Sequence, residues 1–246
     1  MHNLGVTRSR LTRTHLLQTP DTFIRTTLPG MVSANAVVHA APRLGAGFTQ
    51  YTAEFEEGGA LGPTPAQRML YVMEGALTVT FDGTAHALSA GGYAYLPQGA
   101  QHMVSAQGRA RAVVIEKSYV SSSATQPGTA VFGNESNVPS SALMGDDDLQ
   151  VQVLVPDHPE YDFAVNLMTY QPGASLSMVE VHVMEHGLLM LDGGGIYRLG
   201  DDWYPVTKGD FIWMAPYCPQ WFGALGKTPA RYIIYKDSNR HPLGEV

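Results

Sequence analysis

Side chains that can bind a metal are concentrated in one short stretch of the chain, MVEVHVMEHG at residues 178–187. Within it, Glu180, His182 and His186 follow one another at spacings of two and four residues. Alternate residues of a β-strand project from the same face of the sheet, so this spacing predicts three metal-binding side chains on one face. Two imidazoles and one carboxylate suit manganese or iron with open positions for water or substrate, and zinc or nickel would also accept them.

A repeat within the chain supplies a fourth donor. The run LYVMEG that ends at Gly75 matches LLMLDG that ends at Gly193, an offset of 118 residues, and the same offset aligns His102 with Gln220. A constant register of this kind indicates two copies of one β module. Since the repeat places the segment around Gln220 close to the first stretch, the amide oxygen of Gln220 joins the candidate metal ligands.

The first copy lacks the corresponding ligands. Moving back by the same offset takes the three candidates of the second copy to Gly62, Thr64 and Arg68, and none of these is a good metal ligand. Only His102 remains, and we expect it to be a structural imidazole that is hydrogen-bonded inside the first module. The comparison therefore predicts one metal site per chain.

The composition favours a folded, all-β chain that must hold these residues in place. The 246 residues are 44% hydrophobic and 15% charged, and 26 Gly and 16 Pro are spread evenly along them. Runs rich in β-forming residues are broken by dipeptides such as Asp82-Gly83 that suit tight hairpin turns. We expect an N-terminal arm, a first module, a linker rich in Ser, Pro and Gly, and a second module, at residues 1–35, 36–120, 121–148 and 149–246.

Charge and hydropathy exclude several classes of partner. The net charge of −7 provides no broad cationic surface for nucleic acid. No apolar run is long enough to cross a membrane, and the N-terminus lacks the apolar core of a secretion signal. A single cysteine, Cys218, fits a reducing compartment, so we expect a cytoplasmic protein. Apolar runs such as residues 112–115 are expected to bury surface against another module or another chain, and we expect a homo-oligomer.

The two copies resemble the cupin superfamily. In the first copy, Gly91, Pro97, Gly99 and His102 form the pattern G-x5-P-x-G-x2-H of the second cupin motif. Two such modules in tandem are similar to a bicupin, which implies two jelly-roll barrels. We therefore expect an N-terminal barrel without metal ligands and a C-terminal barrel that binds the metal.

The second copy departs from the usual first cupin motif, H-x-H-x3,4-E-x6-G. Glu180, His182 and His186 stand where that motif has His, His and Glu, and Gln220 replaces the His of the second motif. With the surrounding VEVHVMEHGLLMLDGGGIYRL and GDFIWMAPYCPQWFGALG, this rearranged set closely resembles the (S)-ureidoglycine aminohydrolases of purine (allantoin) degradation. The resemblance implies a manganese enzyme that releases ammonia from (S)-ureidoglycine, a small ureido acid, to give (S)-ureidoglycolate. It also implies that these four residues are the metal ligands.

Further residues acquire roles from the same resemblance. Lys236 would pair with the substrate carboxylate, and Tyr232 and Tyr197 would hydrogen-bond its ureido or carboxylate oxygens. Glu180 would carry a proton between water and the leaving amine, so Glu180, Lys236 and Tyr232 are the expected catalytic residues. Without the resemblance, the lysine would be interpreted as a solvated residue at a strand end, and the tyrosines as core aromatics.

Two other functions remain open at this stage. A cupin dioxygenase would use ferrous iron on the same two histidines and carboxylate, and its turnover would consume oxygen. A non-catalytic ligand-binding bicupin is the second alternative, since the first copy already lacks the ligands. Such a protein would be purified without metal and would be inactive.

Overall fold

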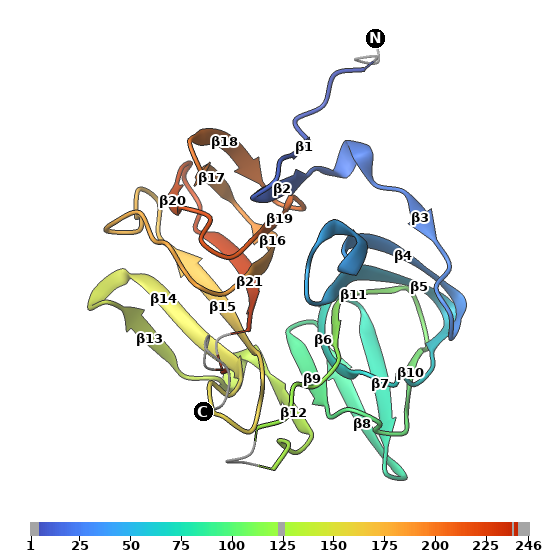
Figure 1. Ribbon diagram of the computed structural model, residues 1–246. Coiled ribbons are helices and arrows are strands. Elements are labelled where there is room, and N and C mark those ends of the chain that lie inside the picture. Colours follow the sequence, from blue (N-terminus) through green and yellow to red (C-terminus); the bar gives the residue numbers. More distant parts are fainter. Residues whose placement is uncertain (1–4, 123–125, 238, 241–246) are drawn as a thin grey trace. The chain divides into compact units, whose positions relative to one another are not determined.

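The computed structural model describes residues 5–122, 126–237 and 239–240, and almost all of its regular structure is β (Figure 1). The described residues contain 21 strands and three short 3-10 helices, η1 (Pro20–Thr22), η2 (Pro42–Leu44) and η3 (Glu135–Asn137). The expected all-β class is therefore confirmed. No helix in the described ranges is long and apolar enough to cross a membrane.

The chain divides into two compact units. In the described part of the chain, the N-terminal unit contains residues 24–138 and 157–162, and the C-terminal unit contains residues 5–23, 139–156 and the residues from 163 onward. Residues 5–23 thus belong to the C-terminal unit, although they precede the whole of the N-terminal unit in sequence.

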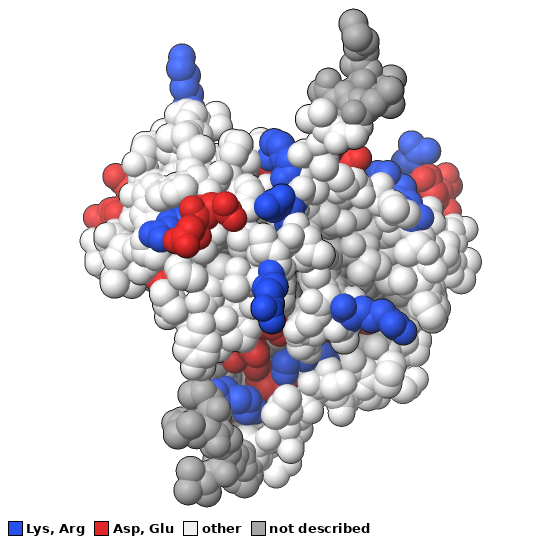
Figure 2. Space-filling view, turned by 45° about the horizontal axis from the view of Figure 1, so that its top comes forward, with Lys and Arg blue, Asp and Glu red and all other residues white. Residues whose placement is uncertain are grey.

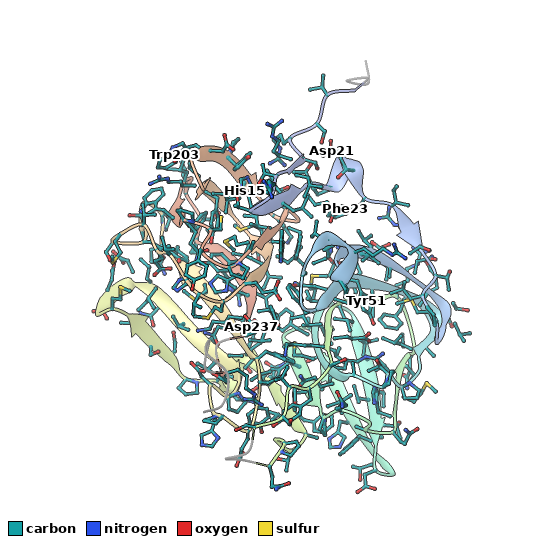
Figure 3. All side chains as sticks on the ribbon, viewed as in Figure 1. His15, Asp21, Phe23, Tyr51, Trp203 and Asp237 are labelled. Carbon is teal, nitrogen blue, oxygen red and sulfur yellow. The ribbon has the colours of Figure 1, made fainter. Side chains whose placement is uncertain are left out.

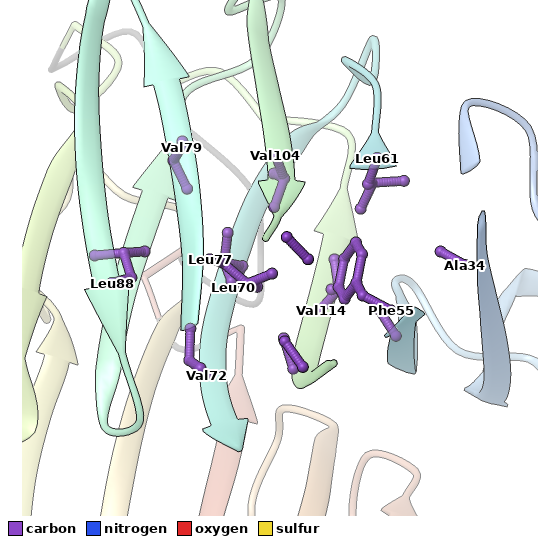
Figure 4. Packing of buried hydrophobic residues seen from close by; sticks show 14 of the residues in the cluster. Ala34, Phe55, Leu61, Leu70, Val72, Leu77, Val79, Leu88, Val104 and Val114 are labelled. Carbon is purple, nitrogen blue, oxygen red and sulfur yellow. The ribbon is translucent and has the colours of Figure 1, made fainter. Parts of the chain in front are cut away.

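The N-terminal unit is built on one ten-stranded sheet. Its strands are β3 (Arg25–Thr26), β4 (Met31–Ala40), β5 (Thr49–Leu61), β6 (Gln67–Glu74), β7 (Ala76–Phe81), β8 (Thr84–Ser89), β9 (Gly92–Leu96), β10 (His102–Ala106), β11 (Ala110–Lys117) and β12 (Val131–Asn134). The main path runs β12-β9-β6-β11-β5-β10-β7-β8, and β4 pairs with β3 and β5. Alternate residues of these strands point inward to form an apolar core, in which Phe55, Val79 and Val114 are members (Figure 4).

The C-terminal unit contains an eight-stranded and a three-stranded sheet. Its strands are β1 (Arg10–Leu11), β2 (His15–Gln18), β13 (Ser140–Leu143), β14 (Asp146–Val155), β15 (Ala164–Tyr170), β16 (His186–Asp192), β17 (Gly194–Leu199), β18 (Asp202–Thr207), β19 (Phe211–Met214), β20 (Gln220–Ala224) and β21 (Ala230–Lys236). The larger sheet has the order β1-β2-β19-β16-β21-β15-β14-β13, and the smaller one has the order β18-β17-β20.

Both units repeat the same central pairing. The order β9-β6-β11-β5 in the N-terminal unit corresponds to β19-β16-β21-β15 in the C-terminal unit. The turns that follow β6 and β16 use Gly75 and Gly193, with φ of 77° and 65°. A Cβ at Gly75 would lie only 2.3 Å from Arg109 O, and a Cβ at Gly193 would lie only 2.5 Å from Pro229 O. Both turns therefore require glycine. The predicted duplication therefore extends to the backbone of the turns.

Segments outside the predicted modules complete each sheet. Strand β2 pairs with β19, and β12 pairs with β9 at the corresponding edge. Residues 121–148, which we expected to be a linker, thus carry β12 and β13 as well as η3. Serine and glycine are tolerated there because an edge strand is held by backbone hydrogen bonds and buries little side-chain surface.

Charged side chains show no concentration of one sign on the face of the molecule drawn in Figure 2. Lysine and arginine occur there singly or in small groups separated by uncharged residues, and some of them lie next to aspartate or glutamate.

Candidate functional site

The two predicted motifs of the second copy meet through a short backbone bridge in the C-terminal unit. The amide of Glu180 donates to Gln220 O at 2.8 Å, and the amide of Gln220 donates back to Glu180 O at 2.9 Å. Gln220 begins β20 and is buried. Glu180 and Gln220, which are 40 residues apart in the chain, therefore lie on adjacent backbone segments.

The expectation that residues 180–186 form one strand is wrong. Only His186 lies in a strand, β16, while Glu180 makes an isolated bridge and residues 181–185 are irregular. The carbonyl of His182 accepts a hydrogen bond from the amide of Tyr217, in the loop before β20, so this stretch pairs with a loop and cannot form a ladder. The alternation in exposure nevertheless persists, because Val181 and Val183 are exposed and the intervening residues are less so.

The three candidate ligands of this stretch are neighbours. His182 Nε2 lies 3.1 Å from Glu180 Oε2, and the rings of His182 and His186 have centroids 5.0 Å apart. His186 Nδ1 lies 2.8 Å from the carbonyl of Glu185, to which it donates, so its Nε2 keeps a free lone pair. Burial, followed by the nearby His182, lowers the pKa of His186 to about 3. The imidazole is therefore neutral, as a metal ligand must be.

Lys236 occupies the position opposite His186 in the pairing of β16 with β21. Its ammonium group contributes to lowering the pKa of His186, after burial and His182. With the Asn166 amide oriented so that its oxygen faces the lysine, Lys236 Nζ donates to that oxygen at 3.2 Å. Lys236 is only partly buried, so its charge lies beside the candidate ligands and remains within reach of a small anion.

The C-terminal unit also contains three buried tyrosines, one of which contacts Gln220. The hydroxyl of Tyr197 donates to Gln220 Oε1 at 3.4 Å, and the hydroxyls of Tyr232 and Tyr170 are 2.8 Å apart. Burial raises the pKa of all three phenols, and the carboxylate of Glu180 raises it further. All three therefore remain protonated and can donate hydrogen bonds. The sequence did not single out Tyr170, because the repeat offset of 118 aligns it with Thr52 and no motif includes it.

Glu185 is a second residue that the sequence analysis missed. It is 5% exposed and accepts a hydrogen bond from Trp213 Nε1 at 2.9 Å. Its amide donates at 3.2 Å to Oδ1 of Asp237, the residue labelled in Figure 3. These contacts hold the backbone carbonyl that orients the ring of His186. No sequence signal distinguished Glu185, because its role depends on contacts with residues far along the chain.

The types of donor fit a divalent metal. Two imidazoles, a carboxylate and an amide oxygen match the ligands that manganese and iron accept. In the described ranges, no three His, Cys, Asp or Glu side chains converge closely enough to form a metal site as they stand. Glu180 Oε2 and His182 Nε2, two of the atoms that could hold an ion, are hydrogen-bonded to each other in this structure. Metal binding would therefore have to replace this bond, and the irregular backbone of residues 181–185 allows such an adjustment.

The N-terminal unit holds a guanidinium at the corresponding place. Arg68 Nη1 donates to Gly62 O at 2.7 Å and lies 2.6 Å from His102 Nε2, and Arg68 Nη2 lies 2.6 Å from Glu116 Oε1. His102 Nδ1 lies 2.8 Å from Ala100 O, to which it donates, so its Nε2 accepts from the arginine. The expected structural role of His102 is confirmed by these hydrogen bonds.

Comparison with protein families identifies two cupin domains in the chain. Residues 44–119 match the EutQ-like cupin domain, and residues 166–235 match the cupin domain. The predicted bicupin architecture is therefore confirmed.

The chain is similar over nearly its full length to curated relatives. It is 40% identical over 244 residues to the (S)-ureidoglycine aminohydrolase of Arabidopsis thaliana, covering 97% of this chain and 80% of the relative. It is 34% identical over 231 residues to the (S)-ureidoglycine aminohydrolase of Escherichia coli K12, covering 91% and 88%. The crystal structure of the protein Ylba from E. coli superposes with a TM-score of 0.86 at 29% identity, covering 99% of this chain and 98% of that one.

Proposed function

Since this chain belongs to the (S)-ureidoglycine aminohydrolase family of cupin proteins, we propose that it hydrolyses (S)-ureidoglycine to (S)-ureidoglycolate and ammonia in purine (allantoin) degradation. The observation that carries this proposal is the grouping of two imidazoles, a carboxylate and an amide beside buried phenols and one ammonium group. Such a site offers a separate partner to each polar group of a small ureido acid.

The reaction replaces the amine on the central carbon of the substrate with a hydroxyl from water. The C–N bond to the amino group breaks, a C–O bond to water forms, and one proton moves from the water to the departing amine as ammonia leaves. Glu180 is the group that carries this proton, because its carboxylate accepts and releases protons beside the reacting carbon. The contact of Glu180 Oε2 with His182 Nε2 at 3.1 Å supports this assignment, because it places the carboxylate beside another candidate ligand.

Binding of the substrate uses charge and hydrogen bonds from the other residues. The Lys236 ammonium pairs with the substrate carboxylate, and the Tyr197 and Tyr232 hydroxyls hydrogen-bond its ureido or carboxylate oxygens. Tyr197 does so by releasing its 3.4 Å bond to Gln220 Oε1. Burial of both phenols, which keeps them protonated, supports these roles. Since the central carbon carries four different groups, fixed partners for three of them select one enantiomer.

Manganese is the proposed metal, with Glu180, His182, His186 and Gln220 as its ligands. When bound, the ion supplies Lewis-acid polarisation and a template for the substrate. The neutral state of His186 and its hydrogen bond through Nδ1 support its role as a ligand. A homo-oligomer in the cytoplasm is part of the same proposal and rests on the composition of the chain.

The decisive experiment measures ammonia release from freshly generated ureidoglycine, with and without manganese, together with oxygen uptake. We expect manganese-dependent ammonia release without oxygen consumption. His182→Ala should lose metal and activity together, with activity reduced by at least about a hundredfold, because loss of a ligand leaves the substrate without its template.

The matched control is His158→Ala, which removes an exposed histidine of the N-terminal unit and should retain full activity and metal content. Full activity of His182→Ala would overturn the assigned metal site. Turnover that requires oxygen would favour the dioxygenase, and a metal-free, inactive wild type would favour the ligand-binding protein.

A further inference from the structure

Tyr170 ends β15 in the interior of the C-terminal unit and is fully buried. Its ring packs edge-on against Phe222 with centroids 4.9 Å apart, and its hydroxyl lies 2.8 Å from that of Tyr232. Burying a hydroxyl costs free energy unless it is hydrogen-bonded, and the contact with Tyr232 meets that requirement. The proposed function assigns a role to Tyr232 but none to Tyr170.

The N-terminal unit has a residue at the position that corresponds to Tyr170, and this residue shows which side chain is sufficient for packing there. In the pairing of β5 with β11, Phe55 lies opposite Ala110, and in the pairing of β15 with β21, Tyr170 lies opposite Ala230. Phe55 therefore corresponds to Tyr170, and it belongs to the apolar core drawn in Figure 4. A phenylalanine ring is enough to fill this place in a barrel, so the hydroxyl of Tyr170 is not required for packing.

The other two phenols are also confined to the C-terminal unit. The same strand alignment places Ala112 at the position of Tyr232, and the repeat offset places Val79 at the position of Tyr197. Both replacements are buried and apolar. Thus three hydroxyls occur together in the unit that carries the candidate metal ligands, and apolar side chains replace all three in the unit where Arg68 takes the corresponding place.

The contact between Tyr170 and Tyr232 restricts what the Tyr232 hydroxyl can do. A phenol has one proton to donate and an oxygen that accepts, so a bond to Tyr170 uses one of these functions and fixes the direction of the other. Tyr232 lies opposite Met190 on β16, two residues before Ile234 and four before Lys236 on the inward face of β21. The hydrogen-bonding function of Tyr232 that remains therefore points into the interior of the C-terminal unit, where Gln220 and Tyr197 are also buried.

We propose that Tyr170 is a positioning residue for the hydrolysis: its hydroxyl orients the hydroxyl of Tyr232 toward the substrate. Tyr170 acts through Tyr232 and does not itself touch the ureido acid. This inference rests on the proposed function, because it assumes that Tyr232 binds the substrate of that reaction.

The test compares kcat and KM for ammonia release by the manganese-loaded wild type, Tyr170→Phe, Tyr232→Phe and the double variant. The lost hydrogen bond should lower kcat/KM of Tyr170→Phe by about three- to tenfold. In the Tyr232→Phe background, Tyr170→Phe should cause no further loss, because the group it orients has been removed. A purely structural role would lower kcat/KM by the same factor in both backgrounds.

Tyr235→Phe is the matched control. Tyr235 is a fully buried tyrosine of β21 that lies on the opposite face of the strand and packs against Phe163, with ring centroids 5.4 Å apart. It should keep wild-type kcat and KM. Metal content and the melting temperature of every variant are measured alongside, and rates are expressed per folded, metal-loaded chain.

The outcomes separate the two proposals. A wild type that releases ammonia while Tyr170→Phe has unchanged kcat/KM, or an equal loss in both backgrounds, overturns the role of Tyr170 and leaves the proposed function intact. A manganese-loaded wild type that releases no ammonia overturns the proposed function and this inference with it.

Discussion

At the scale of single residues, the two units carry side chains of different charge at corresponding positions. Arg68 in β6 corresponds to His186 in β16, and Glu116 in β11 corresponds to Lys236 in β21, since the two pairs lie at matching register positions. The guanidinium is held by the Glu116 carboxylate, the ring of His102 and a backbone carbonyl. In the N-terminal unit, the Arg68 guanidinium thus occupies the polar groups that would otherwise be available to a bound ion.

Replacing Arg68 tests this account. Arg68→Met should lower the free energy of unfolding of the N-terminal unit by about 3 kcal/mol, because it leaves the partners of a buried cation without a donor. Metal content should stay at its wild-type value, since methionine restores no ligand for manganese. Urea denaturation and elemental analysis measure the two quantities.

Arg109→Met is the control for this variant. Arg109 forms an exposed ion pair with Glu56, with both side chains more than half exposed. Its loss should leave the unfolding free energy nearly unchanged. Equal effects of the two substitutions would contradict the structural role of Arg68.

At the scale of elements, strand β2 joins the C-terminal unit although it lies near the N-terminus. Leu17 of β2 is fully buried in the apolar core of that unit, and it pairs with Ile212 of β19. His15, labelled in Figure 3, lies 2.9 Å from the hydroxyl of Tyr204 through its Nε2. The C-terminal unit therefore depends on residues that precede the whole N-terminal unit in sequence.

Truncation of Leu17 should expose this dependence. Leu17→Ala should lower the unfolding free energy of the C-terminal unit by about 3 kcal/mol, through lost apolar burial and the cavity that remains. Denaturation followed by tryptophan fluorescence measures it, because all three tryptophans (Trp203, Trp213 and Trp221) lie in this unit.

Leu11→Ala provides the comparison on the neighbouring strand β1. Leu11 is 62% exposed, so its truncation should change the unfolding free energy little. If Leu17→Ala behaved like Leu11→Ala, β2 would contribute little to the stability of the C-terminal unit.

At the scale of the whole molecule, acid stability reflects histidines that are buried without charge. His39 of β4 is 4% exposed and its Nε2 lies 2.8 Å from Thr52 Oγ1. Burial, followed by the charge of Arg111, lowers the pKa of His39 from 6.5 to about 3. In the unfolded chain the same imidazole has its ordinary pKa of 6.5. Between pH 3 and pH 6.5 it is therefore protonated in the unfolded state and neutral in the folded state.

The sign of the pH dependence follows directly. Stability from this group is fully present above pH 6.5 and falls by about 1.4 kcal/mol per pH unit as the pH decreases toward 3. His39→Gln should give a shallower acid limb in urea denaturation at a series of pH values. His158→Gln, which removes an exposed histidine, should leave the slope as in the wild type. An unchanged slope in His39→Gln would contradict the lowered pKa.

Much of the fold could be predicted because it depends on local patterns. Alternating apolar residues predict strands, and Asp82 and Gly83 adopt positive φ of 48° and 73°, as expected for the tight turn between β7 and β8. The repeat predicted two similar barrels. The strand expected around His182 was wrong, because backbone partners from a distant loop replaced a ladder there.

The amino-acid sequence by itself determined the all-β class, the duplication and the kinds of side chain available for chemistry, because each is recorded in residue type and spacing. Only the tertiary structure decided that Tyr170 meets Tyr232, that Arg68 meets Glu116 and that β2 completes the C-terminal unit. These contacts join residues from 48 to about 200 positions apart. Neither spacing nor composition specifies which distant partners meet, because that depends on how whole sheets close around their cores.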